Sequence, residues 1–130
     1  MAEKRVALVT GAGRGIGATI APTLAKENTD IAVVDYAPAE SAAETLAAIE
    51  GAGVTVRYYS CDVSDFSATK AVVDQVVKDF GKIDILVNNA GVTADNLLMR
   101  MSEAEWDRVL SINLKGCFNM IKHVTPYMMR

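Results

Sequence analysis

Apolar and polar positions follow two different rhythms along this chain. Short runs rich in β-branched residues are separated by longer segments in which apolar residues recur every three or four positions. The runs cover residues 5–10, 30–35, 54–60 and 83–88. Three of them are almost continuously apolar, as expected for parallel strands that are covered on both faces. This alternation predicts βαβ units and an α/β fold with a parallel sheet.

The segments between the runs predict helices at about residues 15–27, 39–50 and 65–80, with a short helical turn at 95–100. Ser102, followed by acidic residues, is typical of the N-cap of a long last helix that reaches towards Arg130. Pro22 lies inside the first helical segment, so that helix either kinks or begins later. The expected buried stripe of the last helix comprises Trp106, Leu110, Leu114, Cys117, Ile121 and Val124.

Composition narrows the possible functions. The 130 residues suffice for one domain, residues 1–130, and 51% of them are apolar. The net charge of −3 provides no electrostatic footprint for nucleic acid or an anionic membrane. We find no stretch typical of a signal peptide or a membrane span, and therefore expect a cytoplasmic protein. Cys61 and Cys117 lack metal-ligand spacing, which favours two buried free thiols, no disulfide and no metal site.

The sequence TGAGRGIG, residues 10–17, follows the first run directly. A strand that leads through a glycine-rich turn into a helix presents free N–H groups and the helix dipole to a phosphate. Gly11, Gly15 and Gly17 match the spacing GxxxGxG. The motif predicts a diphosphate site, and the alternative is a tight turn that only allows close helix packing.

Polar groups also follow the other three runs. Asp35 stands where a dinucleotide fold places a carboxylate for the adenosine ribose. Asp62 could accept from an adenine amino group, or could be a turn or helix-cap residue. The small residues of NNAG, 88–91, would let a flat ring lie against the backbone, or could form only a hydrogen-bonded turn. Each of the four predicted strands is therefore followed by residues that could bind a ligand, and these residues should lie at one edge of the sheet.

Two residues favour different nucleotides, one NAD and the other NADP. A 2′-phosphate would face the charge of Asp35, which favours NAD over NADP. Arg14, in the glycine-rich turn, could accept that phosphate. We expect NAD(H) to be preferred and NADP(H) to remain possible through Arg14.

These motifs, with Asn113 in INLKGCF, together resemble the classical short-chain dehydrogenase/reductase family over the whole chain. Residues 91–118 are similar to 3-oxoacyl-acyl carrier protein reductases. The resemblance implies a Rossmann-like three-layer fold, for which four strands should take the order 3-2-1-4. It implies that Asn113 matches the asparagine of the catalytic tetrad, which kinks its helix. It also implies cofactor contacts from Gly11, Arg14, Gly15, Ile16, Asp35, Tyr36, Asp62, Val63, Asn89, Ala90 and Gly91.

The chain departs from the family pattern in its catalytic residues. The family uses a tyrosine, a lysine four residues later and a serine, and no tyrosine here has a lysine at that spacing. Ser111 lies on the helix of Asn113 and cannot replace the missing serine. We therefore interpret the chain as the truncated, amino-terminal NAD(P)-binding half of such an enzyme, inactive by itself. The alternative is a non-catalytic module for nucleotide binding or self-assembly.

The pattern also predicts partners. The run at 83–88 would be an apolar edge strand, and the last helix, which resembles the family's dimerisation helix, lacks a neighbour. We therefore expect a homo-oligomer through these two elements. Acyl carrier protein would be a partner only of a full-length parent, and no nucleic acid or membrane partner is expected.

Overall fold

Four parallel strands form the centre of the molecule. The computed structural model describes residues 3–13, 16–92 and 97–130. The strands take the order β3-β2-β1-β4, which confirms the prediction. Their bounds are β1 Arg5–Thr10, β2 Thr29–Asp35, β3 Val56–Ser60 and β4 Ile85–Val87.

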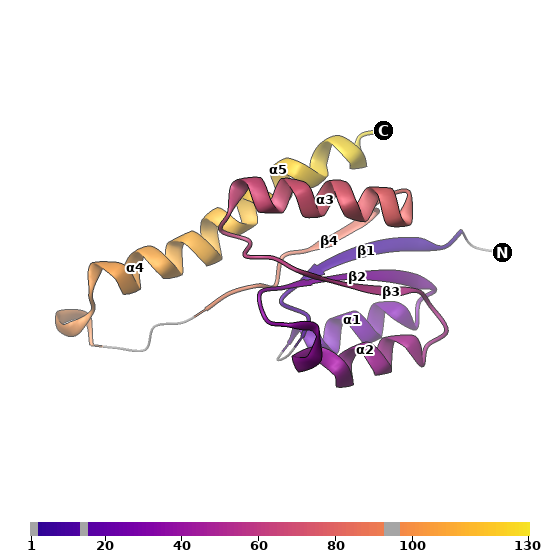
Figure 1. Ribbon diagram of the computed structural model, residues 1–130, viewed down its shortest axis with the longest axis horizontal. Helices are drawn as coiled ribbons and strands as arrows, with labels where there is room; N and C mark the ends of the chain where they lie inside the picture. Colours follow the sequence, from indigo (N-terminus) through magenta and orange to yellow (C-terminus); the bar gives the residue numbers. More distant parts are fainter. Residues whose placement is uncertain (1–2, 14–15, 93–96) are drawn as a thin grey trace.

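Helices cover both faces of this sheet (Figure 1). The helices α1 (Gly17–Ala25) and α2 (Ala43–Glu50), with the 3₁₀ turn η1 (Ala39–Ala42), lie on one face. The helices α3 (Phe66–Phe80) and α5 (Gly116–Met128) lie on the other. Because successive strand residues point to opposite faces, each face has its own buried cluster. Ala7, Val9, Ile31 and Val33 belong to the first cluster, and Leu8, Ala32 and Val34 to the second. This is the expected three-layer α/β arrangement.

The first helix begins two residues later than expected and continues through Pro22. The α1 helix begins at Gly17, and the Lys26 N–H donates to the Pro22 carbonyl at 3.2 Å. Asn28, with φ of 57°, follows the helix in the left-handed region. Arg14 and Gly15, which the motif assigned to the diphosphate, lie outside the described residues.

The last helix begins where predicted but is not continuous. Ser102 caps α4 (Glu103–Leu110) by accepting a hydrogen bond from the Glu105 N–H at 3.1 Å. The segment η3 (Ser111–Lys115) is a π-helical turn, in which the Gly116 N–H donates to the Ser111 carbonyl five residues earlier. Such turns insert one extra residue into a helix. The short turn before α4 is η2 (Leu98–Arg100).

The predicted buried stripe of the last helix is wrong for most of its members. Trp106, Leu114 and Ile121 are 56%, 67% and 52% exposed. Leu110 is exposed and Cys117 is half-buried, so only Val124 is buried as expected. Beyond the π turn the phase of the helix is shifted, so Gly116, Asn119 and Met120 lie inside instead. Trp106 and Leu110 precede the π turn and lie on α4, which projects beyond the sheet (Figure 1).

Two strands are shorter than the apolar runs predicted, because side chains replace the backbone partners at their ends. Before β4, the Val6 N–H donates to the Asp84 carboxylate at 2.9 Å rather than to a strand carbonyl. After β4, the Thr10 hydroxyl oxygen accepts from the backbone N–H groups of Asn89 and Ala90. Before β3, Asp30 accepts from the Thr55 N–H at 2.8 Å.

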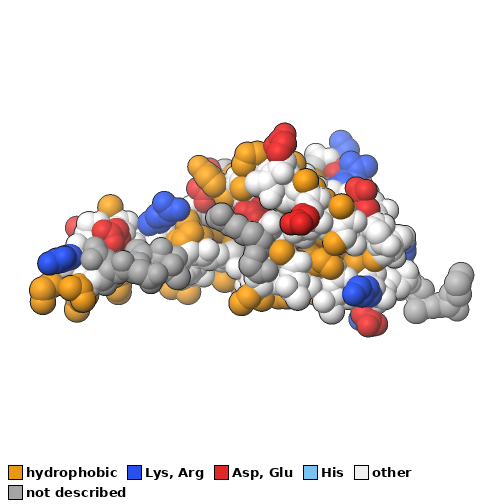
Figure 2. All heavy atoms as spheres, turned by 90° about the horizontal axis from the view of Figure 1, so that it is seen from below, with side chains coloured by type: hydrophobic (Ala, Val, Ile, Leu, Met, Phe, Trp, Pro, Cys, Tyr) orange, Lys and Arg blue, Asp and Glu red, His pale blue; other side chains and the backbone are white. Residues whose placement is uncertain are grey.

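The η2 and α4 elements project beyond the sheet (Figure 1). Figure 2 shows apolar side chains gathered at this projecting end of the molecule. Leu98 and Met99 of η2 are 83% and 89% exposed. Within residues 3–13, 16–92 and 97–130, no helix combines the length and apolar character needed to cross a bilayer.

Candidate functional site

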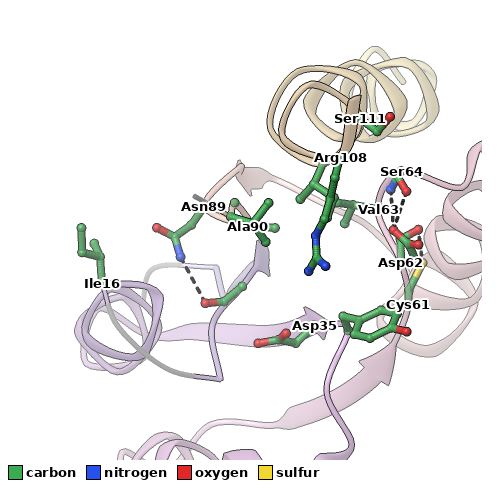
Figure 3. A pocket seen from close by; sticks show the side chains of 15 residues that line it. Ile16, Asp35, Cys61, Asp62, Val63, Ser64, Asn89, Ala90, Arg108 and Ser111 are labelled. Carbon is green, nitrogen blue, oxygen red and sulfur yellow. Dashed lines mark hydrogen bonds between the residues drawn. The ribbon is translucent and has the colours of Figure 1, made fainter. Parts of the chain in front are cut away.

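A cleft of about 830 Å³ lies at the carboxyl ends of the strands (Figure 3). It is bounded by the β1–α1 turn, the ends of β2 and β3, the segment after β4, and the junction of α4 with η3. The lining residues are Gly11, Ile16, Asp35, Tyr36, Cys61, Asp62, Val63, Ser64, Asn89, Ala90, Gly91, Val92, Arg108, Ser111 and Ile112. Every predicted cofactor contact within the described residues is among them.

The β1–α1 turn brings the backbone close to the segment after β4. Gly11 has φ of +67°, and a Cβ added there would lie 2.8 Å from the Ala90 Cα. Its N–H donates to the Val34 carbonyl at 2.8 Å. Within the described residues, no side chain accepts a hydrogen bond from the first turn of α1, where Ile16 is 73% exposed. Backbone N–H groups at a helix start without such a cap can bind an anion.

Asp35 is held at the end of β2 by its neighbours. One carboxylate oxygen accepts from the Gly13 N–H at 3.1 Å, and the other accepts from the Ala37 N–H at 3.4 Å. The adjacent Tyr36 is 76% exposed. The carboxylate thus has a defined position on the cleft wall and can accept hydrogen bonds from hydroxyl groups.

Asp62 forms a turn after β3. Its Oδ1 accepts from the Ser64 N–H at 3.0 Å and from the Ser64 hydroxyl at 2.7 Å. The N-cap of α3 is Asp65, which accepts from the Ala68 N–H at 2.9 Å. Asp62 is therefore a turn residue and not a helix cap, and it still lines the cleft.

Cys61 lies beside Asp62 and is 7% exposed. Burial is the main cause that raises the pKa of its thiol to about 11, and the nearby carboxylates of Asp62 and Asp65 contribute to the same rise. A thiol with such a pKa remains protonated near neutral pH and is a poor nucleophile. Cys61 and Cys117 are both free thiols, as predicted, but only Cys61 is buried as expected, since Cys117 is half-buried.

The residues after β4 are fixed to β1. The Thr10 hydroxyl oxygen accepts from the N–H groups of Asn89 and Ala90, both at 3.0 Å. The Asn89 side-chain amide donates to the Gly11 carbonyl at 3.1 Å. The segment 88–91 is therefore a hydrogen-bonded turn, which was the alternative interpretation of NNAG. It also forms part of the cleft wall.

Asn113 is not among the lining residues. Its Oδ1 accepts from the Val92 N–H at 2.8 Å, and its Nδ2 donates to the Val92 carbonyl at 2.9 Å. It is the central residue of the π turn, so the helix is distorted where the resemblance implied a kink. The side chain positions the strand-end segment instead of merely facing solvent.

Arg108 and Asn119 are among the residues that the sequence did not single out and that contribute to the site. Arg108 extends from α4 into the cleft (Figure 3). Asn119 is fully buried, and its Nδ2 donates to the Val63 carbonyl at 2.8 Å. Spacing could have indicated Arg108, which lies four residues before Ile112 on the same helix face. Asn119 had no comparable signal, because its partner is distant in sequence.

The sheet order, the glycine turn and the polar strand ends define a dinucleotide-fold protein. Residues 5–130 match the family model of the short chain dehydrogenases. The chain belongs to this family.

Several known proteins are similar to this chain. The 3-oxoacyl-[acyl-carrier-protein] reductase FabG of Staphylococcus aureus is 49% identical over all of this chain and 53% of that protein. The short-chain reductase protein NovJ of Streptomyces niveus is 45% identical over 100% of this chain and 49% of that protein. NAD⁺-bound xylitol dehydrogenase has a TM-score of 0.90 at 42% identity, covering 96% of this chain and 48% of that one. The chain thus spans about half the length of these relatives.

Proposed function

We propose that this chain binds a nicotinamide adenine dinucleotide in the cleft and supplies the cofactor-binding half of an NAD(P)-dependent oxidoreductase. The observation that carries the proposal is the convergence of the glycine turn, Asp35 and the segment after β4 on one cleft. Two similar proteins support it as well, since xylitol dehydrogenase is NAD⁺-bound and the carveol dehydrogenase of Mycobacterium avium, 33% identical with a TM-score of 0.89, is in complex with NAD.

Each part of the cleft has a proposed role. The first turn of α1, with Gly11, Arg14, Gly15 and Ile16, binds the diphosphate. The end of β2, with Asp35 and Tyr36, receives the adenosine ribose, and the turn after β3, with Asp62 and Val63, receives the adenine. The segment Asn89, Ala90 and Gly91 lies against the remainder of the dinucleotide.

Asp35 should make the chain prefer NAD to NADP. Its carboxylate accepts hydrogen bonds from ribose hydroxyls and repels a 2′-phosphate. Calorimetric titration with NAD, NADP, ADP and AMP tests this preference, and Asp35→Ala should narrow the difference between NAD and NADP. Tighter binding of NADP by the unaltered chain would mean that Arg14 governs the choice. Absence of binding by all four nucleotides would overturn the proposed function.

The parent activity that we propose is reduction of 3-oxoacyl thioesters, as the names of the similar FabG proteins suggest. The cofactor would supply the hydride, and Asn113 would hold the segment at Val92 in place. Acyl carrier protein would be the partner of a full-length parent. Because no tyrosine in the 130 residues is followed four positions later by lysine, we propose that this chain is a truncated half without turnover. Oxidation of NADH with an acetoacetyl thioester by the purified chain would contradict this.

A second candidate is a non-catalytic module that binds nucleotides or self-assembles. The exposed apolar side chains of α4 and α5 favour it, because such surface is typical of a contact with a partner. We propose self-association through the edge strand β4 and the exposed apolar side of α4 and α5. Nucleotide binding without restored turnover, when the carboxyl-terminal half of a FabG relative is added in trans, would favour this module.

A further inference from the structure

Arg108 extends into the cleft from α4, on the side opposite the ends of β2 and β3 (Figure 3). Among the described lining residues it is the cation, and Asp35 and Asp62 are the carboxylates. A long side chain on an exposed helix can usually turn to solvent. In this structure it points into the space between the strand ends.

Within the described residues, the guanidinium of Arg108 forms no ion pair with the protein. The ion pairs found there join Lys4 to Asp30, Lys70 to Asp74, and Lys82 to Glu3 and Asp84. No hydrogen bond to the Arg108 side chain occurs among these residues either. Its donors and its planar face are therefore available to a ligand.

The two walls of this end of the cleft suit a flat ring. Ile112 lies one helical turn after Arg108 and lines the same cleft. Cys61, Asp62 and Val63 line the cleft from the turn after β3, where Asn119 fixes the Val63 carbonyl. A planar base between these walls would meet the Arg108 guanidinium, which stacks readily on aromatic faces.

We propose that Arg108 stacks on the adenine ring and closes this end of the cleft over the bound nucleotide. This inference rests on the proposed function and adds a binding residue that the sequence motifs do not contain. The guanidinium acts on the base through its planar face. It therefore contributes equally to NAD, ADP and AMP, which share the adenine, and contributes little to nicotinamide mononucleotide, which lacks it.

Calorimetric titrations of the 130-residue chain can test this role. Arg108→Ala should weaken binding of AMP, ADP and NAD by the same factor, about fivefold, at both low and high ionic strength. Arg108→Lys keeps the charge without the planar group and should lose nearly as much affinity. Arg57→Ala removes an exposed arginine from β3 outside the lining residues and should leave binding unchanged.

The possible failures are distinguishable. Full affinity in Arg108→Lys, or a loss that disappears at high salt, would show that Arg108 acts as a charge and would overturn the stacking role. Unchanged affinity in Arg108→Ala, with normal binding by the unaltered chain, would overturn this inference alone. If the unaltered chain bound none of the adenine nucleotides, the proposed function would fail and this role with it. A circular dichroism melt of each variant confirms that the fold is retained.

Discussion

Gly11 combines two constraints at the residue scale. Its φ of +67° is in the left-handed region, and its missing Cβ leaves room for the Ala90 backbone. Gly53 has a similar φ of +81°, but a Cβ there would meet nothing within 4 Å. A comparison of alanine variants at the two positions therefore separates the free-energy cost of the left-handed backbone from the free-energy cost of the close approach to Ala90.

We predict that Gly11→Ala destabilises the chain more than Gly53→Ala. The left-handed conformation should cost about 1 kcal/mol in both variants. In Gly11→Ala, displacement of the segment after β4 adds to that cost and should also weaken nucleotide binding. Urea unfolding and calorimetry with NAD measure the two effects. Equal loss of stability in the two variants, with binding intact, would contradict the proposed close approach.

At the element scale, α5 holds the turn after β3 in place. Asn119 donates to the Val63 carbonyl, and Gly116 lets the helix approach, since a Cβ there would lie 2.7 Å from the Val63 Cγ2. The Asn119 Oδ1 is buried without a hydrogen-bond partner within the described residues. A helix on one face of the sheet therefore positions part of the cleft.

We predict that Asn119→Ala lowers the free energy of unfolding by roughly 1–3 kcal/mol, because the Val63 carbonyl loses its donor in the interior. Binding of AMP should weaken as well, since the Asp62–Val63 turn is no longer fixed. Thr125→Ala is the control, because Thr125 is exposed on the same helix and its hydroxyl donates to the Ile121 carbonyl of that helix. Loss of stability with unchanged AMP affinity would mean that Asn119 serves packing only.

At the scale of the whole molecule, Asp84 joins the start of β4 to β1. Burial opposes ionisation of this carboxyl, but the Val6 N–H and the Lys82 ammonium outweigh it and hold its pKa below the ordinary 3.8. A lowered pKa stabilises the folded chain above pH 4, and this contribution is lost as the pH falls through the folded-state pKa.

We therefore predict that Asp84→Asn is less stable than the unaltered chain at pH 7 and that the difference shrinks as the pH falls below 4. Urea unfolding over a pH series measures it. A difference in stability that stays constant across the series would show that the charge of Asp84 has no part in joining the strands.

We also predict self-association of the chain. Leu114, Phe118 and Ile121 are 67%, 55% and 52% exposed on the last helix, and apolar surface of this kind favours a partner. Light scattering at tens of micromolar should give a mass above 13.9 kDa. Leu114→Glu should lower it, whereas Glu44→Lys on the exposed side of α2 should not. A monomer mass for the unaltered chain would contradict this prediction.

The local pattern predicted the strands and the Ser102 cap because those depend on neighbours in sequence, whereas the sheet order followed from the family resemblance and the rules of βαβ connection. It misplaced the ends of β3 and β4, where Asp30, Thr10 and Asp84 provide hydrogen bonds from distant strands. It also misplaced the buried face of the last helix. Beyond residue 115 the extra residue of the π turn changes the helical phase, and a 3.6-residue pattern does not contain that information. Nor does such a pattern show that α4, which carries Trp106 and Leu110, projects beyond the sheet.

The sequence by itself determined the α/β class and the residues that meet at the carboxyl edge of the sheet, because strand periodicity and glycine spacing are local properties. Only the tertiary structure placed Arg108 inside the cleft, bonded Asn113 to Val92 and buried Asn119 against the Val63 carbonyl. These contacts join segments 21 to 56 residues apart, or depend on where a helix lies over the sheet. Tertiary packing determines these contacts, and a short sequence pattern cannot predict them.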